Sequence, residues 1–220
     1  MTPQQIARFF TVMARSLDAP ATVLLTGAAA GTLMGAGRPS RDVDFAVVLP
    51  RRRGAVPPWD QVERAVQAAT RQTGIAAQFA EDISRWSLIS FLDYARRTRP
   101  YRRFGPVEVR VLEPAYWAIG KLTRYLDLDV QDLIRVLRRA RGGGSGAASI
   151  RGSRARLAPE PLARLWGRAL KASPRSDACW SFRHHVETFF HRHGPAIWGR
   201  AFEPARAIAV FHRAAGIRET

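Results

Sequence analysis

The chain has 220 residues, of which 46% are hydrophobic, and a formal net charge of +17 at pH 7. This length suits one domain, or one core with a small appendage, and no apolar run reaches the roughly 18 residues of a membrane helix, so we expect no membrane partner. The basic excess favours a polyanionic partner. The single cysteine, Cys179, excludes an internal disulfide and fits a cytoplasmic protein.

Strands and helices alternate over the first 141 residues. Thr2 and Pro3 predict the start of an amphipathic helix, because they suit the N-cap and the first turn. The expected helices are 3–17, 28–36, 60–73, 114–127 and 130–141, the last with Asp129 as N-cap. The expected strands are 22–26, 43–49, 75–80 and 107–112, the last from the alternation in VEVRVL. Residues 82–105 receive no element.

The composition changes after residue 141. The stretch GGGSGAASIRGSR predicts a flexible Gly/Ser/Arg linker over 142–157. Beyond it we expect helices near 159–171, 176–193 and 203–214, and in the second of these the phenylalanines form the core face while His and Arg face solvent. The predicted fold class is α/β (α+β): a mixed central sheet flanked by helices over 1–141, and an all-helical region over 158–220.

Two carboxylates, Asp42 and Asp44, stand one residue apart within an apolar run. Side chains at i and i+2 of a strand point to the same face, about 7 Å apart along the strand. Two like charges this close repel each other unless a cation lies between them. Mg²⁺ is the expected cation, because it prefers carboxylate oxygens and keeps room for substrate phosphates.

Upstream of the two aspartates, a short strand ends at Gly27 and a helix of small residues follows. A strand, a glycine turn and a helix N-terminus can hold a phosphate through backbone N–H groups. A later expected strand carries a single acidic residue, Glu108. Three carboxylates on neighbouring strands can hold two Mg²⁺ ions, or Mn²⁺ in their place, and Asp82 is an alternative third ligand.

This arrangement of Gly27, Asp42, Asp44 and Glu108 resembles the DNA polymerase β-like nucleotidyltransferase superfamily. More narrowly, TGAAAGTLMGAGRPSRDVDF, VEVRVL and KLTRYLDLDVQDL make the chain similar to the bacterial minimal and AbiEii-like nucleotidyltransferases, which occur as toxins in toxin–antitoxin pairs. The similarity covers about residues 20–140. The chain differs from the superfamily in having Gly-Ala where Gly-Ser is usual, and Glu as its third carboxylate.

The resemblance implies a Mg²⁺-dependent enzyme that moves NMP from an NTP onto an acceptor. Asp42, Asp44 and Glu108 would be catalytic metal ligands. The implied acceptor is RNA, such as a tRNA 3′ end, or a protein hydroxyl, and an antitoxin protein is an expected partner. Further residues would contact the nucleotide: Gly27, Ala28, Arg38, Ser40, Lys121 and Arg124.

The segment YARRTRPYRRF interleaves arginine with aromatic residues, a pattern that suits single-stranded RNA. The candidate RNA-binding residues are Arg96, Arg97, Tyr101, Arg102 and Arg103. Three other functions stay open: a catalytically inactive nucleotidyltransferase-fold module that binds RNA or acts as an antitoxin, an antibiotic adenylyltransferase, which the basic charge disfavours, and a DNA-binding regulator.

Overall fold

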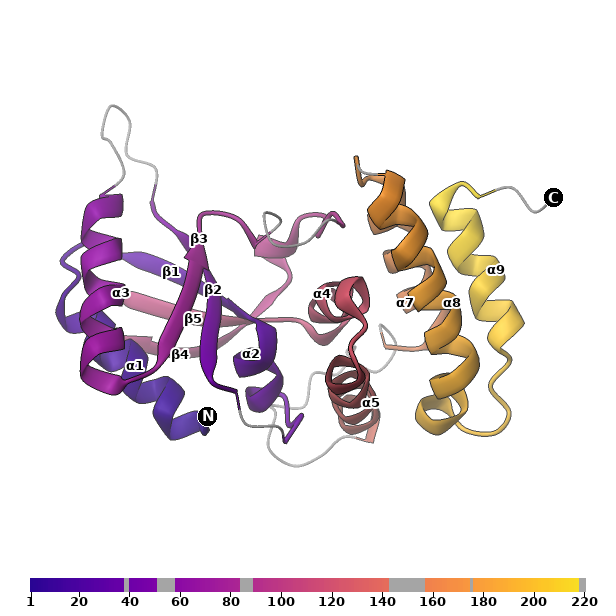
Figure 1. The fold of residues 1–220 in the computed structure, drawn as a ribbon, viewed down its shortest axis with the longest axis horizontal. Helices are drawn as coiled ribbons and strands as arrows, with labels where there is room; N and C mark the ends of the chain where they lie inside the picture. The colour runs from indigo at the N-terminus through magenta and orange to yellow at the C-terminus, as the bar shows by residue number, and fades with distance from the viewer. Residues whose placement is uncertain (38–39, 51–57, 84–88, 143–156, 175, 218–220) are drawn as a thin grey trace. The chain divides into compact units, whose positions relative to one another are not determined.

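The computed structural model describes residues 1–37, 40–50, 58–83, 89–142, 157–174 and 176–217. The chain divides into two compact units. The sheet unit contains all five strands and the helices α1 to α3, and the helical unit contains α4, α5, α7, α8 and α9 with Met34–Gly37 and residues 89–94 (Figure 1).

The sheet unit is built on a five-stranded mixed sheet with the order β3-β2-β1-β5-β4. Its strands are β1 (Ala21–Thr26), β2 (Asp42–Val48), β3 (Ala76–Ala80), β4 (Thr98–Phe104) and β5 (Val107–Leu112). β1 runs antiparallel to β2 and parallel to β5, while β3 is parallel to β2 and β4 is antiparallel to β5. The predicted fold class is therefore confirmed.

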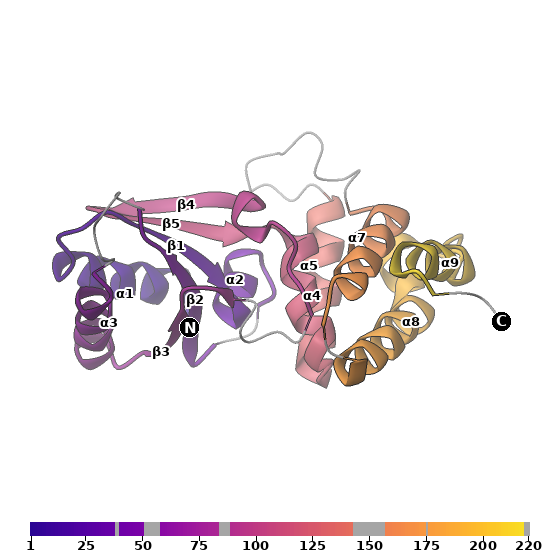
Figure 2. The same cartoon turned by 90° about the horizontal axis from the view of Figure 1, so that it is seen from above.

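Helices α1 (Pro3–Arg15) and α3 (Trp59–Thr73) cover the same face of this sheet (Figure 2). Thr2 and Gln5 form a capping box that starts α1, as the sequence predicts for Thr2. On the covered face, Phe10 contacts Phe45 with ring centroids 5.5 Å apart. The short helix α2 (Gly27–Leu33) follows β1 directly and contacts β1 and β2. Because strand side chains alternate, the polar residues of β2 and β5 lie on the other face.

The helical unit consists of α4 (Pro114–Arg124), α5 (Asp127–Gly142), α7 (Pro159–Lys171), α8 (Ser176–Trp198) and α9 (Pro204–Ala215). Its core contains the fully buried aromatic side chains of Trp117, Trp166, Phe182, Phe189, Phe190 and Phe211. Trp166 Nε1 donates to the backbone oxygen of Ala115 at 3.1 Å, which ties α7 to α4. The core face predicted for the phenylalanines of α8 is confirmed.

Several boundaries differ from the sequence predictions. Residues 98–104, which had received no element, form the edge strand β4. Helix α5 begins at Asp127, so Asp129 lies in its first turn and is not its N-cap. The compact units divide between β5 and α4 and not at the expected linker, because α4 and α5 pack on α7 and α8. Residues 143–156, most of that linker, lie outside the described residues.

No helix in the described part of the chain is long and apolar enough to cross a membrane.

Candidate functional site

Asp42 and Asp44 occupy the start of β2, where the chain enters the sheet next to the end of β1. Asp44 pairs across the sheet with Thr26, the last residue of β1. The two aspartates stand at i and i+2 of one strand, so their side chains share a face, as the sequence predicts. Both are partly exposed, whereas Val43 and Phe45 between and beside them are fully buried.

Gly27 lies directly against the carboxylate of Asp44. Its φ is +62°, a left-handed conformation that glycine adopts without steric cost. A Cβ at this position would stand 1.9 Å from Asp44 Oδ2 and 2.9 Å from Asp44 Cβ. The glycine of the turn therefore has a specific role: it leaves the space that the second aspartate occupies.

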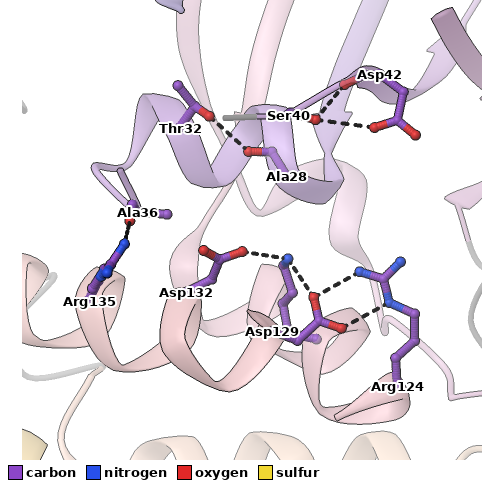
Figure 3. A network of polar contacts seen from close by, with 10 residues as sticks. Ala28, Thr32, Ala36, Ser40, Asp42, Arg124, Asp129, Asp132 and Arg135 are labelled. Atoms are coloured by element: carbon purple, nitrogen blue, oxygen red, sulfur yellow. Dashed lines mark hydrogen bonds and ion pairs between the residues drawn. The ribbon is translucent and has the colours of Figure 1, made fainter. Parts of the chain in front are cut away.

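Ser40 holds the first aspartate. Its Oγ lies 2.8 Å from the backbone oxygen of Asp42 and 3.1 Å from Asp42 Oδ1, as Figure 3 shows. The N-terminal ammonium of Met1 donates to the backbone oxygen of Ser40 at 2.7 Å. The family resemblance implied that Ser40 and Arg38 contact the nucleotide. The structure directs the Ser40 hydroxyl to Asp42, and Arg38 lies outside the described residues.

Glu108 does not join the two aspartates, which corrects the expected trio of carboxylates. It is level with Thr22 on β1, whereas Asp44 is level with Thr26. Four residues of strand separate these levels, about 13 Å. The reason is direction: β5 runs parallel to β1, so a residue near the start of β5 lies beside the start of β1, while the aspartates lie beside its end.

The Glu108 carboxylate has its own partners. Arg110 Nη1 lies 2.8 Å from Oε1 and Arg103 Nη2 lies 3.1 Å from Oε2. Arg103 is also the cross-strand neighbour of Glu108 on β4. These contacts form a surface ion-pair network at the β4–β5 edge.

The alternative third ligand, Asp82, is also remote. The start of β3 is level with Asp42, and Asp82 follows the other end of that strand. Opposite Asp42 and Asp44, β3 places Ala76 and Gln78. Among the described residues, no group of three or more His, Cys, Asp or Glu side chains could hold a metal ion. Asp42 and Asp44 remain as a carboxylate pair, a donor set that suits one Mg²⁺ with water and phosphate oxygens completing its shell.

Lys121 and Arg124, the other predicted nucleotide contacts, belong to the helical unit. Lys121 is 2% exposed, and its Nζ lies 2.7 Å from Asp129 Oδ1 and 2.9 Å from Asp132 Oδ2. Arg124 binds the same Asp129 through Nη2 at 2.9 Å (Figure 3). The charges of Lys121 and Arg124 are therefore directed to two buried carboxylates of α5.

On the same helix α5, Arg135 Nη1 donates to the backbone oxygen of Ala36 at 3.0 Å. This contact fastens the segment that follows α2 to the helical unit.

The candidate RNA-binding residues lie on β4 and just before it. Arg96, Arg97, Arg102 and Arg103 are exposed. Tyr101 is half-buried and donates to the backbone oxygen of Pro3 at 3.4 Å, and its burial raises the pKa of its hydroxyl. β4 is an edge strand with a register shift between Pro100 and Arg102. The arginines thus form a basic border to the sheet, with the aromatic ring of Tyr101 turned to α1.

The Ser40–Asp42 contact and the space that Gly27 leaves for Asp44 were not predicted from the sequence. The signal that could have found the second is the glycine itself, since a turn glycine before a carboxylate strand commonly allows a close approach.

Comparison of the chain with protein-family models, with curated proteins and with solved structures found no match in any of the three.

Proposed function

We propose that the sheet unit binds a Mg²⁺–nucleoside triphosphate at Asp42 and Asp44 and transfers its NMP to an acceptor hydroxyl. The observation that carries this proposal is the close approach of the Asp44 carboxylate to Gly27, with a second carboxylate two residues away on the same strand face. Glycine at +62° leaves room for one oxygen, and Ser40 orients the other aspartate.

In this proposal the chain has three tasks. Asp42 and Asp44 supply oxygen ligands, Ser40 fixes the orientation of Asp42, and Gly27 keeps the Asp44 carboxylate in place. Bound Mg²⁺ would neutralise the negative charge of the triphosphate. The acceptor oxygen forms a bond to the α-phosphorus, the bond to the bridging oxygen of pyrophosphate breaks, and the hydroxyl proton leaves to solvent.

The acceptor class follows from charge. A net charge of +17 and the exposed arginines of β4 favour RNA over a protein hydroxyl. The resemblance to toxin nucleotidyltransferases further favours growth inhibition as the biological role, with an antitoxin protein as partner. If this is right, expression of the chain arrests growth, and Asp44→Asn restores it at equal protein level.

A second candidate function is a catalytically inactive module of the same fold that binds RNA or acts as an antitoxin. Two observations favour it: Ala28 stands where the superfamily has the serine of the turn, and Glu108 lies about 13 Å along the sheet from the level of Asp44. Such a module would bind RNA without using an NTP.

The decisive experiment incubates the purified chain with each α-³²P-labelled NTP, Mg²⁺ and total tRNA. We expect label transfer from one NTP, falling by roughly two orders of magnitude or more in Asp44→Asn because metal stabilisation is worth several kcal/mol. Glu108→Gln is the matched control, since it removes a carboxylate outside the pair. RNA retention without transfer of any label would favour the inactive module instead.

A further inference from the structure

Two pairs of stacked rings, Trp180 on His184 and His185 on Tyr125, are formed by helix α8 and the residue after α4, and the planes of the two histidines are tilted by 56°. Trp180 is 71% exposed, although its ring lies parallel to that of His184, with 10° between planes and 6.0 Å between centroids. His184 is followed by His185 at 6.2 Å, and His185 stacks on Tyr125 at 4.7 Å and 11°. We call these four residues the ring row.

The inner end of the ring row is fixed by the helical core. His185 Nδ1 lies 2.8 Å from the backbone oxygen of Leu122 near the end of α4, and burial lowers the pKa of its imidazole. Tyr125 follows α4 in a left-handed conformation, φ +53°, which costs a non-glycine residue energy, and its ring stacks on His185. The rings at this end therefore have defined positions.

The outer end of the ring row is exposed in the described part of the chain. Trp180 and His184 are both exposed, and the buried side of α8 is occupied by Phe182, Val186 and Phe189. Trp180 and His184 thus present two parallel rings to solvent on one face of α8. Stacked rings, rather than aliphatic side chains, are what an unpaired base recognises, because every base has a π-face.

Cations surround the ring row. Arg192 is exposed and acts electrostatically on Tyr125, whose hydroxyl pKa burial raises. Arg124 and Arg183 are ion-paired with Asp129 and Glu187, and their side chains are still 56% and 43% exposed. Asp177 is an exposed acid on the first turn of the same helix. Arginines beside aromatic rings form the combination that tracks a nucleic-acid backbone while its bases stack.

We propose that the ring row of α8 is a binding surface for single-stranded nucleic acid, in which unpaired bases stack on Trp180 and His184 while neighbouring arginines contact phosphates. This surface belongs to the helical unit, whereas the arginines of β4 belong to the sheet unit. It does not rest on nucleotidyl transfer, so an inactive site at Asp44 leaves it intact.

The test is fluorescence anisotropy of a labelled twelve-nucleotide oligoadenylate with the full chain at physiological salt. We expect Trp180→Ala to weaken binding about tenfold, the loss expected for one stacked base. Trp180→Phe keeps a ring and stays within about threefold of wild type. His184→Ala gives a smaller loss and serves if Trp180→Ala fails to fold by circular dichroism.

One control variant and two alternative ligands separate this proposal from others. Val48→Ala removes an exposed apolar side chain elsewhere and leaves binding unchanged. The proposal is overturned if the wild-type chain does not bind the oligonucleotide, if Trp180→Ala binds within twofold of wild type, if it weakens duplex RNA equally, or if it affects only binding to anionic vesicles.

Discussion

Gly27→Ala is the sharpest perturbation of the candidate site. Two costs follow from the structure. At φ +62° a non-glycine residue pays about 1–2 kcal/mol for the left-handed conformation. The new Cβ would also stand 1.9 Å from Asp44 Oδ2, so the carboxylate must move or the turn must open. Overpacking of this kind typically adds about 1–3 kcal/mol.

Gly74→Ala is the matched control. Gly74 ends α3 in the same unit at φ +70°, and a Cβ there would meet nothing within 4 Å. It therefore pays the backbone cost alone. We expect Gly74→Ala to lower the thermal midpoint by a few degrees, at about 2–4 °C per kcal/mol for a chain of this size. Gly27→Ala should lower it by at least twice as much.

The two variants also differ in ligand binding. Displacement of Asp44 should abolish the Mg²⁺-dependent stabilisation by NTP, measured as the rise in thermal midpoint on adding Mg²⁺ and nucleotide, while Gly74→Ala keeps it. In an Asp44→Gly background the clash is absent, so Gly27→Ala should cost no more than Gly74→Ala. Equal destabilisation by both alanines in the wild-type background would refute the reasoning.

The remaining predictions concern other groups described above. Lys121→Met removes the buried cation that Asp129 and Asp132 share, although Arg124 still binds Asp129, and should lower the free energy of unfolding in urea by about 3–5 kcal/mol, whereas the exposed Lys171→Met should change it by less than about 0.5 kcal/mol. Glu108→Gln should keep NTP-induced stabilisation, and Asp44→Asn should lose it. Burial raises the pKa of Tyr125 to about 12; the folded state then holds this proton more tightly, so stability is present below the ordinary pKa of about 10 and is lost as pH rises toward 12. Absorbance titration at 295 nm should show one late-titrating phenol that Tyr125→Phe removes.

Each of these predictions has an outcome that would contradict it. Equal stability of the Lys121 and Lys171 variants would mean that the buried carboxylates tolerate the loss of their cation. Loss of NTP stabilisation in Glu108→Gln would return that residue to the metal site. An unchanged late phase in Tyr125→Phe would assign the high-pKa phenol to another tyrosine.

Local patterns of the sequence predicted the aspartate pair and the first helix. Asp42 and Asp44 share a face because strand alternation alone decides it. The cap at Thr2 follows from a side chain and a backbone three residues apart. The register between β1 and β5 could not be predicted in this way, because strands whose paired residues lie 86 positions apart along the chain align through tertiary packing. That register moves Glu108 away from Asp44.

The strand β4 was missed for a related reason. Its sequence, TRPYRRF, lacks the apolar alternation of a half-buried strand, because an edge strand pairs on one side only. Its two buried side chains, Thr98 and Phe104, stand at its ends, with arginines and Pro100 between them. β4 forms because its backbone pairs with β5, although its own sequence does not indicate a strand.

The composition of β4 has a consequence for how the protein behaves at high concentration. The unpaired edge of a sheet can pair with a strand of another molecule. The edge strand β4 contains Pro100, which has no backbone N–H, a register shift and several arginines. The β4 arginines of a second copy would repel those of the first at this edge. We therefore expect that replacing those arginines with threonine makes the chain prone to fibrous self-association.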